Sequence, residues 1–151
     1  MKYLKSLTTV FLLICVINIF GCQRVPERPN DLPELMPCTI FVTFGGKKLA
    51  EVGIQLVPKN AINDSAKRWA AGGKTDAEGK SALKTAFYYS GVAEGEYYIL
   101  FTKFEPSQTN KNGVLLPAKN LIPAKYSQTK TAQIVAITKH QSEYTFELEG
   151  L

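Results

Sequence analysis

Apolar and polar side chains alternate along much of the chain. Apolar residues occupy every second position in Thr39–Phe44, in Val52–Pro58 and most clearly in Glu96–Phe104. The same alternation returns in residues 131–137 and 143–148. A period of two places one set of side chains on one face of a strand, so these stretches are predicted as strands. The core-facing residues are then Ile40, Val42, Phe44, Val52, Ile54, Leu56, Tyr97, Ile99, Phe101, Val135, Ile137, Tyr144, Phe146 and Leu148.

Turn signals separate the strands. Gly45–Lys48 is predicted to turn the chain into a hairpin whose return strand is Val52–Pro58, since glycine adopts positive φ freely. Asp76–Gly79 is predicted as a tight turn between strands over residues 69–75 and 80–86. About seven short strands with frequent turns, and no amphipathic helix, predict an all-β fold, a seven-stranded Greek-key β-sandwich.

Two segments lack the alternation. Residues 59–68 are polar and are predicted to form a loop. Residues 105–126 are predicted to be irregular, and irregular connections of this length are usually functional or mobile.

The N-terminal residues carry a different pattern. Lys2 and Lys5 precede the apolar run Val10–Ile17, and no further charge occurs before Arg24. A helix that crosses a bilayer needs about 20 mainly apolar residues. The shorter run here is typical of a secretory signal peptide, which we assign to residues 1–21.

The motif Ile19-Phe20-Gly21-Cys22 ends this region. It resembles the lipobox of bacterial lipoproteins, although Phe20 is bulkier than the residue usual there. The resemblance implies cleavage before Cys22, a diacylglyceryl group on its thiol and an acylated amine, so that the lipid holds the protein on a membrane. Each buried methylene contributes about 0.8 kcal/mol to such anchoring. The alternative is a plain signal peptide or an uncleaved anchor, with Cys22 present by chance.

The segment after the cysteine is rich in proline. Residues 22–37 contain Pro26, Pro29, Pro33 and Pro37. Proline at this density favours extended chain and disfavours helix and sheet. We therefore expect a tether over 22–37 and a folded domain over 38–151. The residue after the cysteine is Gln23. Aspartate at that position resembles a signal that retains lipoproteins in the inner membrane of enteric bacteria. Glutamine there therefore slightly favours the outer membrane of the cell envelope.

Charge and cysteine content narrow the possible partners. The net charge is +5, but the lysines are scattered, as on an ordinary solvated surface, and nucleic-acid binding is not expected of an exported protein. With Cys15 in the signal and Cys22 lipidated, Cys38 has no partner for an internal disulfide. We expect Cys38 to be a small buried residue that begins a strand.

Four stretches are similar to one known family. They are Thr43–Leu49, Gly73–Lys80, Gly91–Tyr97 and Leu121–Tyr126. Together they resemble the carboxypeptidase-regulatory-like, or transthyretin-like, domain of short bacterial envelope lipoproteins. Gly73–Lys80 carries the pattern G-x-T-D-x-x-G-x, in which Asp76 caps turn amides and Gly79 takes the left-handed conformation. Ser81 and Gln133 depart from the family pattern. The resemblance implies an accessory domain that carries no zinc.

No catalytic constellation is visible. Related 5-hydroxyisourate hydrolases need several histidines and a C-terminal Tyr-Arg-Gly-Ser motif, whereas this chain has one histidine, His140, in a predicted turn. Asp76 and Glu78 offer too few oxygens for calcium, which takes six to eight. We therefore expect no enzymatic activity, no cofactor and no metal site.

Two functions remain. The first is a membrane-anchored structural or protein-interaction module of the envelope, with strand edges and residues 105–126 as contact surface. The second is a carbohydrate-binding module that stacks envelope polysaccharides on Trp69, Tyr88 and Tyr89, which lie beside Phe87. The same aromatic residues could instead complete the core, because aromatics are common in strands.

Overall fold

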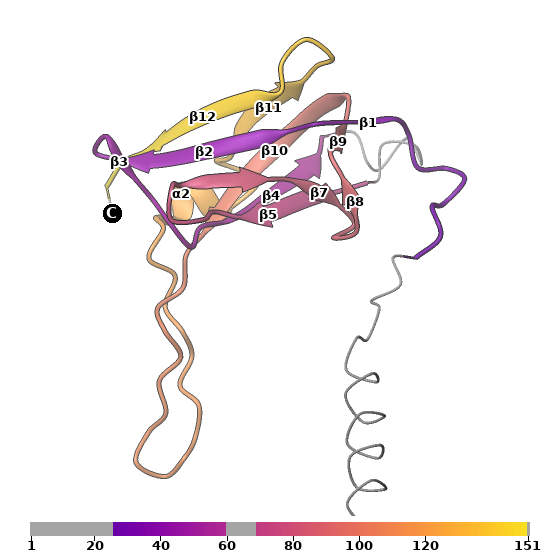
Figure 1. Ribbon diagram of the computed structural model, residues 1–151. Helices are drawn as coiled ribbons and strands as arrows, with labels where there is room; N and C mark the ends of the chain where they lie inside the picture. The colour runs from indigo at the N-terminus through magenta and orange to yellow at the C-terminus, as the bar shows by residue number, and fades with distance from the viewer. Residues whose placement is uncertain (1–25, 60–68, 151) are drawn as a thin grey trace, which may run out of the picture.

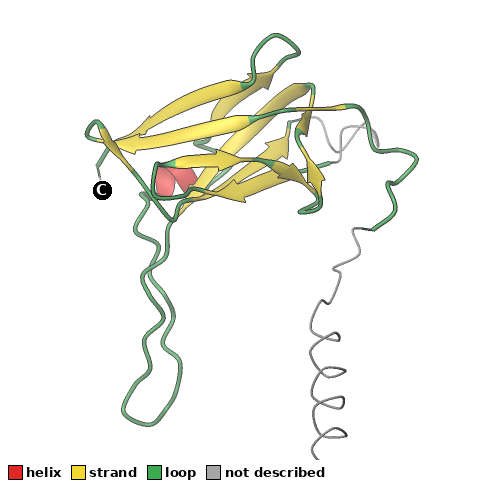
Figure 2. Ribbon diagram, in the orientation of Figure 1, coloured by secondary structure: helices red, strands yellow, loops and turns green. Residues whose placement is uncertain are grey.

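The computed structural model describes residues 26–59 and 69–150, which fold into a β-sandwich (Figures 1 and 2). The expected signal peptide, Cys22 and all but the first residue of the polar loop at 59–68 lie outside the described residues. No helix in the described part of the chain has the length and apolar character that crossing a bilayer requires.

Two main sheets face each other, and a small third sheet lies at one end. The first sheet contains, in spatial order, β11 (Gln133–Ile137), β10 (Gly95–Thr102), β4 (Gly53–Pro58), β5 (Ala71–Lys74), β7 (Lys84–Thr85) and β8 (Tyr89–Ser90). The second contains β12 (Glu143–Leu148), β2 (Thr39–Phe44) and β3 (Lys47–Lys48), with β6 (Lys80–Ala82) also paired to β2. The third pairs β1 (Leu35–Met36) with β9 (Val92–Ala93), and the helix α2 spans Ala124–Ser127.

The connections confirm the Greek-key prediction. β4, β5 and β7 pair antiparallel in succession, and β10 returns to pair antiparallel with β4. The spatial order β10-β4-β5-β7 is the arrangement that defines a Greek key. Among the described residues, seven strands have three or more residues, namely β2, β4, β5, β6, β10, β11 and β12.

The core lies between the two main sheets, where the alternation placed it. β4 and β10 pair Ile54 with Phe101 and Leu56 with Ile99, and all four side chains are buried. Val42 faces them from β2. Of the other predicted core residues, Ile40, Val52, Tyr97, Val135, Ile137, Tyr144 and Leu148 are buried, whereas Phe44 and Phe146 are partly buried against the cluster.

Cys38 also belongs to this core. Its side chain is buried, as expected, and its thiol is free. Burial raises the pKa of the Cys38 thiol to about 11, because a thiolate loses its hydration there. The thiol therefore stays neutral and unreactive in the folded protein.

The predicted hairpin between Thr39–Phe44 and Val52–Pro58 is wrong. The return strand is β3, which pairs Lys48 with Thr43, while β4 belongs to the opposite sheet. The chain crosses from one sheet to the other between β3 and β4, and the side chain of Thr75 contacts this crossing segment. The Thr75 hydroxyl donates to the Leu49 carbonyl (2.8 Å) and accepts from the Val52 amide (2.9 Å). Alternation predicts a strand and its inner face, but not the sheet to which the strand belongs.

The predicted strand over residues 80–86 is divided between the two sheets. β6 pairs with β2, and β7 pairs with β5. The buried Leu83 lies between them, and its amide donates to the Cys38 carbonyl (2.9 Å). A strand that changes sheets in this way closes one edge of a sandwich.

Two proline-containing segments are more ordered than expected. Within the expected tether, Leu35 and Met36 form β1, although we expected no strand there. The segment over 105–126, predicted to be irregular, begins as a long projecting hairpin and ends in α2 (Figure 1).

The turn at Asp76–Gly79 forms as predicted. The Asp76 carboxylate accepts hydrogen bonds from the amides of Glu78 (3.0 Å) and Lys80 (2.9 Å). Gly79 has a φ of 70°, and a Cβ there would lie 2.6 Å from the Val42 carbonyl oxygen. Glycine is thus required by both its backbone conformation and its close approach to β2.

Gly79→Ala should destabilise the fold more than Gly45→Ala. Both glycines have positive φ, but no atom lies within 4 Å of a Cβ at Gly45. The left-handed conformation alone should cost Gly45→Ala about 1 kcal/mol, whereas the clash at Gly79 adds about 1–3 kcal/mol. Urea denaturation measures both free energies of unfolding. Equal losses of free energy of unfolding in the two variants would show that the backbone near Gly79 and Val42 moves apart to accommodate a Cβ without loss of stability.

Asp76→Ala should lower the free energy of unfolding by about 1–2 kcal/mol, because two turn amides lose their acceptor. Asp76→Asn keeps an oxygen in place and should lose much less. Added calcium should change neither value if Asp76 acts only as a cap. A calcium-dependent rise in wild-type thermal stability that Asp76→Ala abolishes would instead indicate a metal site.

Candidate binding surface

The outer face of the six-stranded sheet is unusually apolar. Because side chains alternate, Tyr98 and Leu100 of β10 point away from the core and are only partly buried. Tyr98 lies between Ile134 of β11 and Val57 of β4, and Ile134 is 50% exposed. The outer face of a two-layer sandwich is normally polar. This apolar row therefore distinguishes the face from an ordinary solvated surface.

A groove of about 750 Å³ is hollowed into this same face. Leu100 and Gln55 lie on its floor beside Gly72, which has no side chain. A Cβ on Gly72 would lie 2.8 Å from the Ile54 carbonyl oxygen, so close pairing of β4 and β5 requires glycine and leaves the floor bare. The remaining lining residues are Gly53, Ile54, Trp69, Ala70, Ala71, Gly73, Lys74, Lys84, Ala86, Phe87, Thr102 and Ser127.

Phe87 lines the groove from a strained turn between β7 and β8. Ala86 and Phe87 both have positive φ, at 49° and 66°. For residues with a Cβ this conformation costs about 1–2 kcal/mol each. The turn nevertheless holds Phe87 with 85% of its surface exposed. Strained backbone conformations of this kind occur preferentially at functional sites, where they hold a side chain in the position that binding requires.

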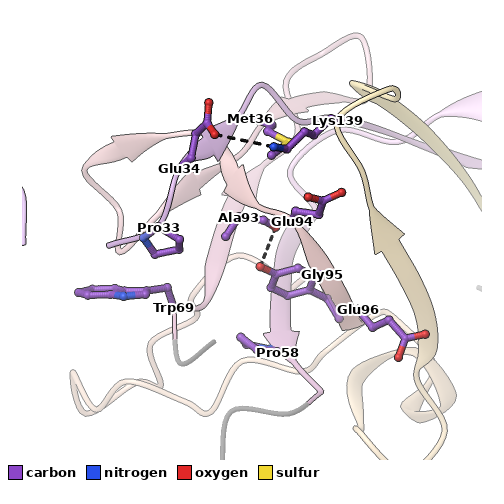
Figure 3. A pocket seen from close by; sticks show the side chains of 11 residues that line it. Pro33, Glu34, Met36, Pro58, Trp69, Ala93, Glu94, Gly95, Glu96 and Lys139 are labelled. Carbon is purple, nitrogen blue, oxygen red and sulfur yellow. Dashed lines mark hydrogen bonds and ion pairs between the residues drawn. The ribbon is translucent and has the colours of Figure 1, made fainter. Parts of the chain in front are cut away.

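Trp69 lies between this groove and a second hollow. The second hollow, of about 480 Å³, is lined by Trp69 together with Pro33, Pro58 and Tyr97 (Figure 3). The indole N–H donates to the Asp31 carbonyl oxygen (3.2 Å). Trp69 thus contacts the N-terminal segment on one side and contributes to the groove on the other.

Tyr88 and Tyr89 do not join Trp69 at the groove. Their rings meet edge to face, with centroids 6.4 Å apart, and neither lines the groove or the hollow. The Tyr89 hydroxyl lies 2.8 Å from the Glu27 carbonyl oxygen and 3.2 Å from that of Pro26. Of the three predicted ligand-binding residues, only Trp69 lies at the groove, and its partner there is Phe87.

Residues 26–36 form a segment that we call the strap. The hydroxyl of Tyr89 makes one of several contacts between the strap and the sandwich. The Arg28 guanidinium donates to the Pro33 carbonyl oxygen (2.7 Å) within the strap itself, and Leu32 of the strap is buried. β1 pairs with β9 through two residues, and Glu34 lies 4.0 Å from Lys139 (Figure 3). The described part of the expected tether therefore lies against the sandwich.

The titratable side chains Glu34, Glu94, Glu96 and Lys139 also line the second hollow (Figure 3). His140 is exposed in the turn before β12, as predicted. No cluster of three His, Cys, Asp or Glu side chains that could hold a metal ion occurs in the ranges 26–59 and 69–150. Tyr97 is buried, and burial, followed by the Cys38 thiolate that forms only at high pH, raises the pKa of Tyr97 to about 12. Its hydroxyl donates to the Ala93 carbonyl oxygen (2.9 Å), which is a structural bond.

Comparison with known proteins gives distant structural neighbours. No protein-family model matches the chain, and no curated protein matches it. One solved structure, the major pilin subunit BcpA of Bacillus cereus with the change D312A, is similar with a TM-score of 0.41 and 16% identity over 78% of this chain. BcpA itself is similar with a TM-score of 0.38 and 18% identity over 76%. The chain covers 30% and 29% of those two chains, less than a third of their length.

Proposed function

We propose that this protein is a membrane-anchored, non-catalytic interaction module of the cell envelope. Lipid on Cys22 holds it to a membrane, with the outer membrane slightly favoured. The sandwich belongs to the carboxypeptidase-regulatory-like group, as the turn at Asp76–Gly79 suggests. Its partner is a protein that binds the outer face of the six-stranded sheet.

The exposure of Phe87 carries this proposal. The turn that holds Phe87 85% exposed lowers the stability of the free protein, because two residues adopt an unfavourable φ while the ring gains no burial in return. A partner that covers the ring gains apolar burial without having to reorganise the turn. Exposed aromatic side chains beside a groove are typical anchors of protein interfaces.

The charges around the groove indicate the chemistry of the partner. Lys84 projects from β7 beside Phe87 and forms no ion pair among the described residues. Lys74 lies on the same face and contacts Glu51. An apolar patch with lysine at its rim favours a partner whose surface presents an apolar side chain next to an acidic one. A standard interface of about 800 Å² per partner extends beyond the groove and would also cover the row of Ile134, Tyr98 and Val57.

Carbohydrate is the second candidate ligand. Trp69, Phe87, Gln55 and Lys74 line one groove, and aromatic rings together with amide groups can bind sugar rings. The three-residue platform of Trp69, Tyr88 and Tyr89 is not supported, because the two tyrosines lie away from the groove. A sugar would instead bind between Trp69 and Phe87.

The lipid anchor should be visible on the native N-terminus. Mass spectrometry of the protein purified from membranes is expected to find chains that begin at Cys22 and carry acyl groups. Cys22→Ser should remain uncleaved or leave the membrane fraction, whereas Cys38→Ser should behave like the wild type. A soluble native protein with an unmodified Cys22 thiol would contradict the anchor.

Phe87→Gly should separate binding from stability. Glycine removes the ring and relieves the strain, so the free energy of unfolding should stay unchanged or rise by up to about 1 kcal/mol. Cross-linking in the intact envelope should lose its protein adduct in Phe87→Gly and keep it in Tyr88→Ala, the matched control with an exposed neighbouring ring. An adduct that persists in Phe87→Gly would contradict the interface.

The same variants test the carbohydrate alternative. If envelope polysaccharide binds between Trp69 and Phe87, the fluorescence of Trp69 should shift in the wild type and in Tyr88→Ala but not in Phe87→Gly. A fluorescence shift without a protein adduct would favour carbohydrate over protein as the ligand.

A further inference from the structure

Residues 103–121 form a finger that projects from the end of β10 (Figure 1). Its two arms are joined by backbone hydrogen bonds at Leu121–Lys103 (2.7 Å), Glu105–Lys119 (2.9 Å) and Leu116–Gln108 (2.8 Å). Pro106 and Pro117 lack an amide hydrogen and interrupt the ladder between these bonds. The finger is therefore a hairpin whose ladder is interrupted at the two prolines.

The tip of the finger is closed by a capped turn. The Asn110 side-chain oxygen accepts hydrogen bonds from the amides of Asn112 and Val114, both at 2.9 Å. Gly113 has a φ of 78° and completes the reversal. The turn places Val114, Leu115 and Leu116 at the start of the returning arm, next to the tip, where Val114 pairs with Asn110 and Leu116 with Gln108.

These three residues are exposed although they are strongly apolar. Val114 is 58% exposed, Leu115 66% and Leu116 42%. Every residue from 106 to 119 is exposed, so the finger has no core of its own. Contiguous apolar surface of this kind marks a contact with a membrane or another molecule.

The charge of the finger is complementary to an anionic surface. Lys111 and Lys119 are exposed and form no ion pair among the described residues. Glu105, at the base, is the only acidic residue between 103 and 121. Apolar side chains that enter the headgroup region and lysines that contact anionic lipids reinforce each other in interfacial binding.

The strap and the finger lie at opposite ends of the sandwich (Figure 1). The first described residues of the strap and the finger extend toward the same side of the sandwich (Figure 1). Three residues lie between Cys22 and Pro26, and the four steps of an extended chain from one to the other span at most about 14 Å. With the strap docked, the membrane that holds Cys22 therefore lies close to the side on which the finger projects.

We propose that the finger inserts Val114, Leu115 and Leu116 into the headgroup region of an anionic bilayer, with Lys111 and Lys119 on the lipid phosphates. This inference rests on the anchor proposed above. The finger then supplies a second attachment that orients the sandwich on the membrane. The outer face of the six-stranded sheet does not take part in this contact.

Site-specific fluorescence tests the insertion. The acylated full-length mature protein is reconstituted into vesicles of phosphatidylethanolamine and phosphatidylglycerol, with an environment-sensitive fluorophore on Leu115→Cys. The buried Cys38 should escape labelling. The matched control carries the fluorophore on His140→Cys, in the exposed turn before β12. The label at 115, but not the label at 140, should shift to shorter wavelength and be quenched by nitroxides attached to the lipid.

Charge variants make the test more specific. Lys111→Gln and Lys119→Gln should each lower the insertion constant of the labelled finger roughly fivefold. Vesicles of phosphatidylcholine alone, which lack anionic lipid, remove both contributions and should lower the insertion constant roughly 25-fold.

Flotation of the vesicles separates failure of the finger from failure of the anchor. Protein that floats with vesicles while the label at 115 stays in water overturns the insertion and leaves the anchor intact. Protein that does not float overturns both. A label shielded only after envelope proteins are added also overturns the insertion, because the finger then binds a protein.

Discussion

The pairing of β4 with β10 is the constraint on which the rest of the structure depends. Its register sets Ile54 against Phe101 and Leu56 against Ile99 on the inner face. The same register sets Tyr98 against Val57 and Leu100 against Gln55 on the outer face. A slip of one residue would exchange the two faces and move the core side chains into water. Because both faces of β10 are apolar, one register creates the core and also leaves an apolar surface outside it. The end of β10 then fixes where the finger leaves the sandwich.

The sequence predicted the strands and their inner faces well, because a period of two is a local property of the chain. The choice of sheet depends on contacts distant in sequence. Thr75 bonds to residues 49 and 52 and guides the crossing that separates β3 from β4. Ser81, a departure from the family pattern, is buried, and a Cβ on Gly73 would lie 2.3 Å from its hydroxyl oxygen. A larger side chain at Gly73 or at Ser81 would therefore require the other residue to move. The alternation of apolar and polar residues along the chain does not predict this contact. Gln133, the other departure, lies exposed at the start of β11 and leaves the core intact.

The candidate site was predicted only in part, for a related reason. Composition drew attention to Trp69, Tyr88 and Tyr89, but a tyrosine in a strand end can bind a ligand, fill the core or hold another segment. The structure gives Tyr89 the last of these roles, since its hydroxyl contacts the strap. Phe87 was noticed only as a neighbour. Its importance comes from the positive φ of Ala86 and Phe87, which no propensity for these two residues would have predicted. A weaker signal was present in Tyr98 and Leu100, which are apolar at positions that alternation assigns to solvent.

The strap links the two proposed contacts. Its contacts with the sandwich include a two-residue ladder, hydrogen bonds from Trp69 and Tyr89, one weak ion pair and the buried Leu32. Exposed bonds of this kind contribute little individually. Detachment would lengthen the extended chain between Cys22 and the sandwich from about 14 Å to about 50 Å. The finger could then no longer be held near the membrane by the anchor, while the outer face of the six-stranded sheet would reach partners farther away. Since Trp69 contacts the strap through Asp31 and also lines the groove, a ligand that moves the indole would act on the fastening that sets this distance.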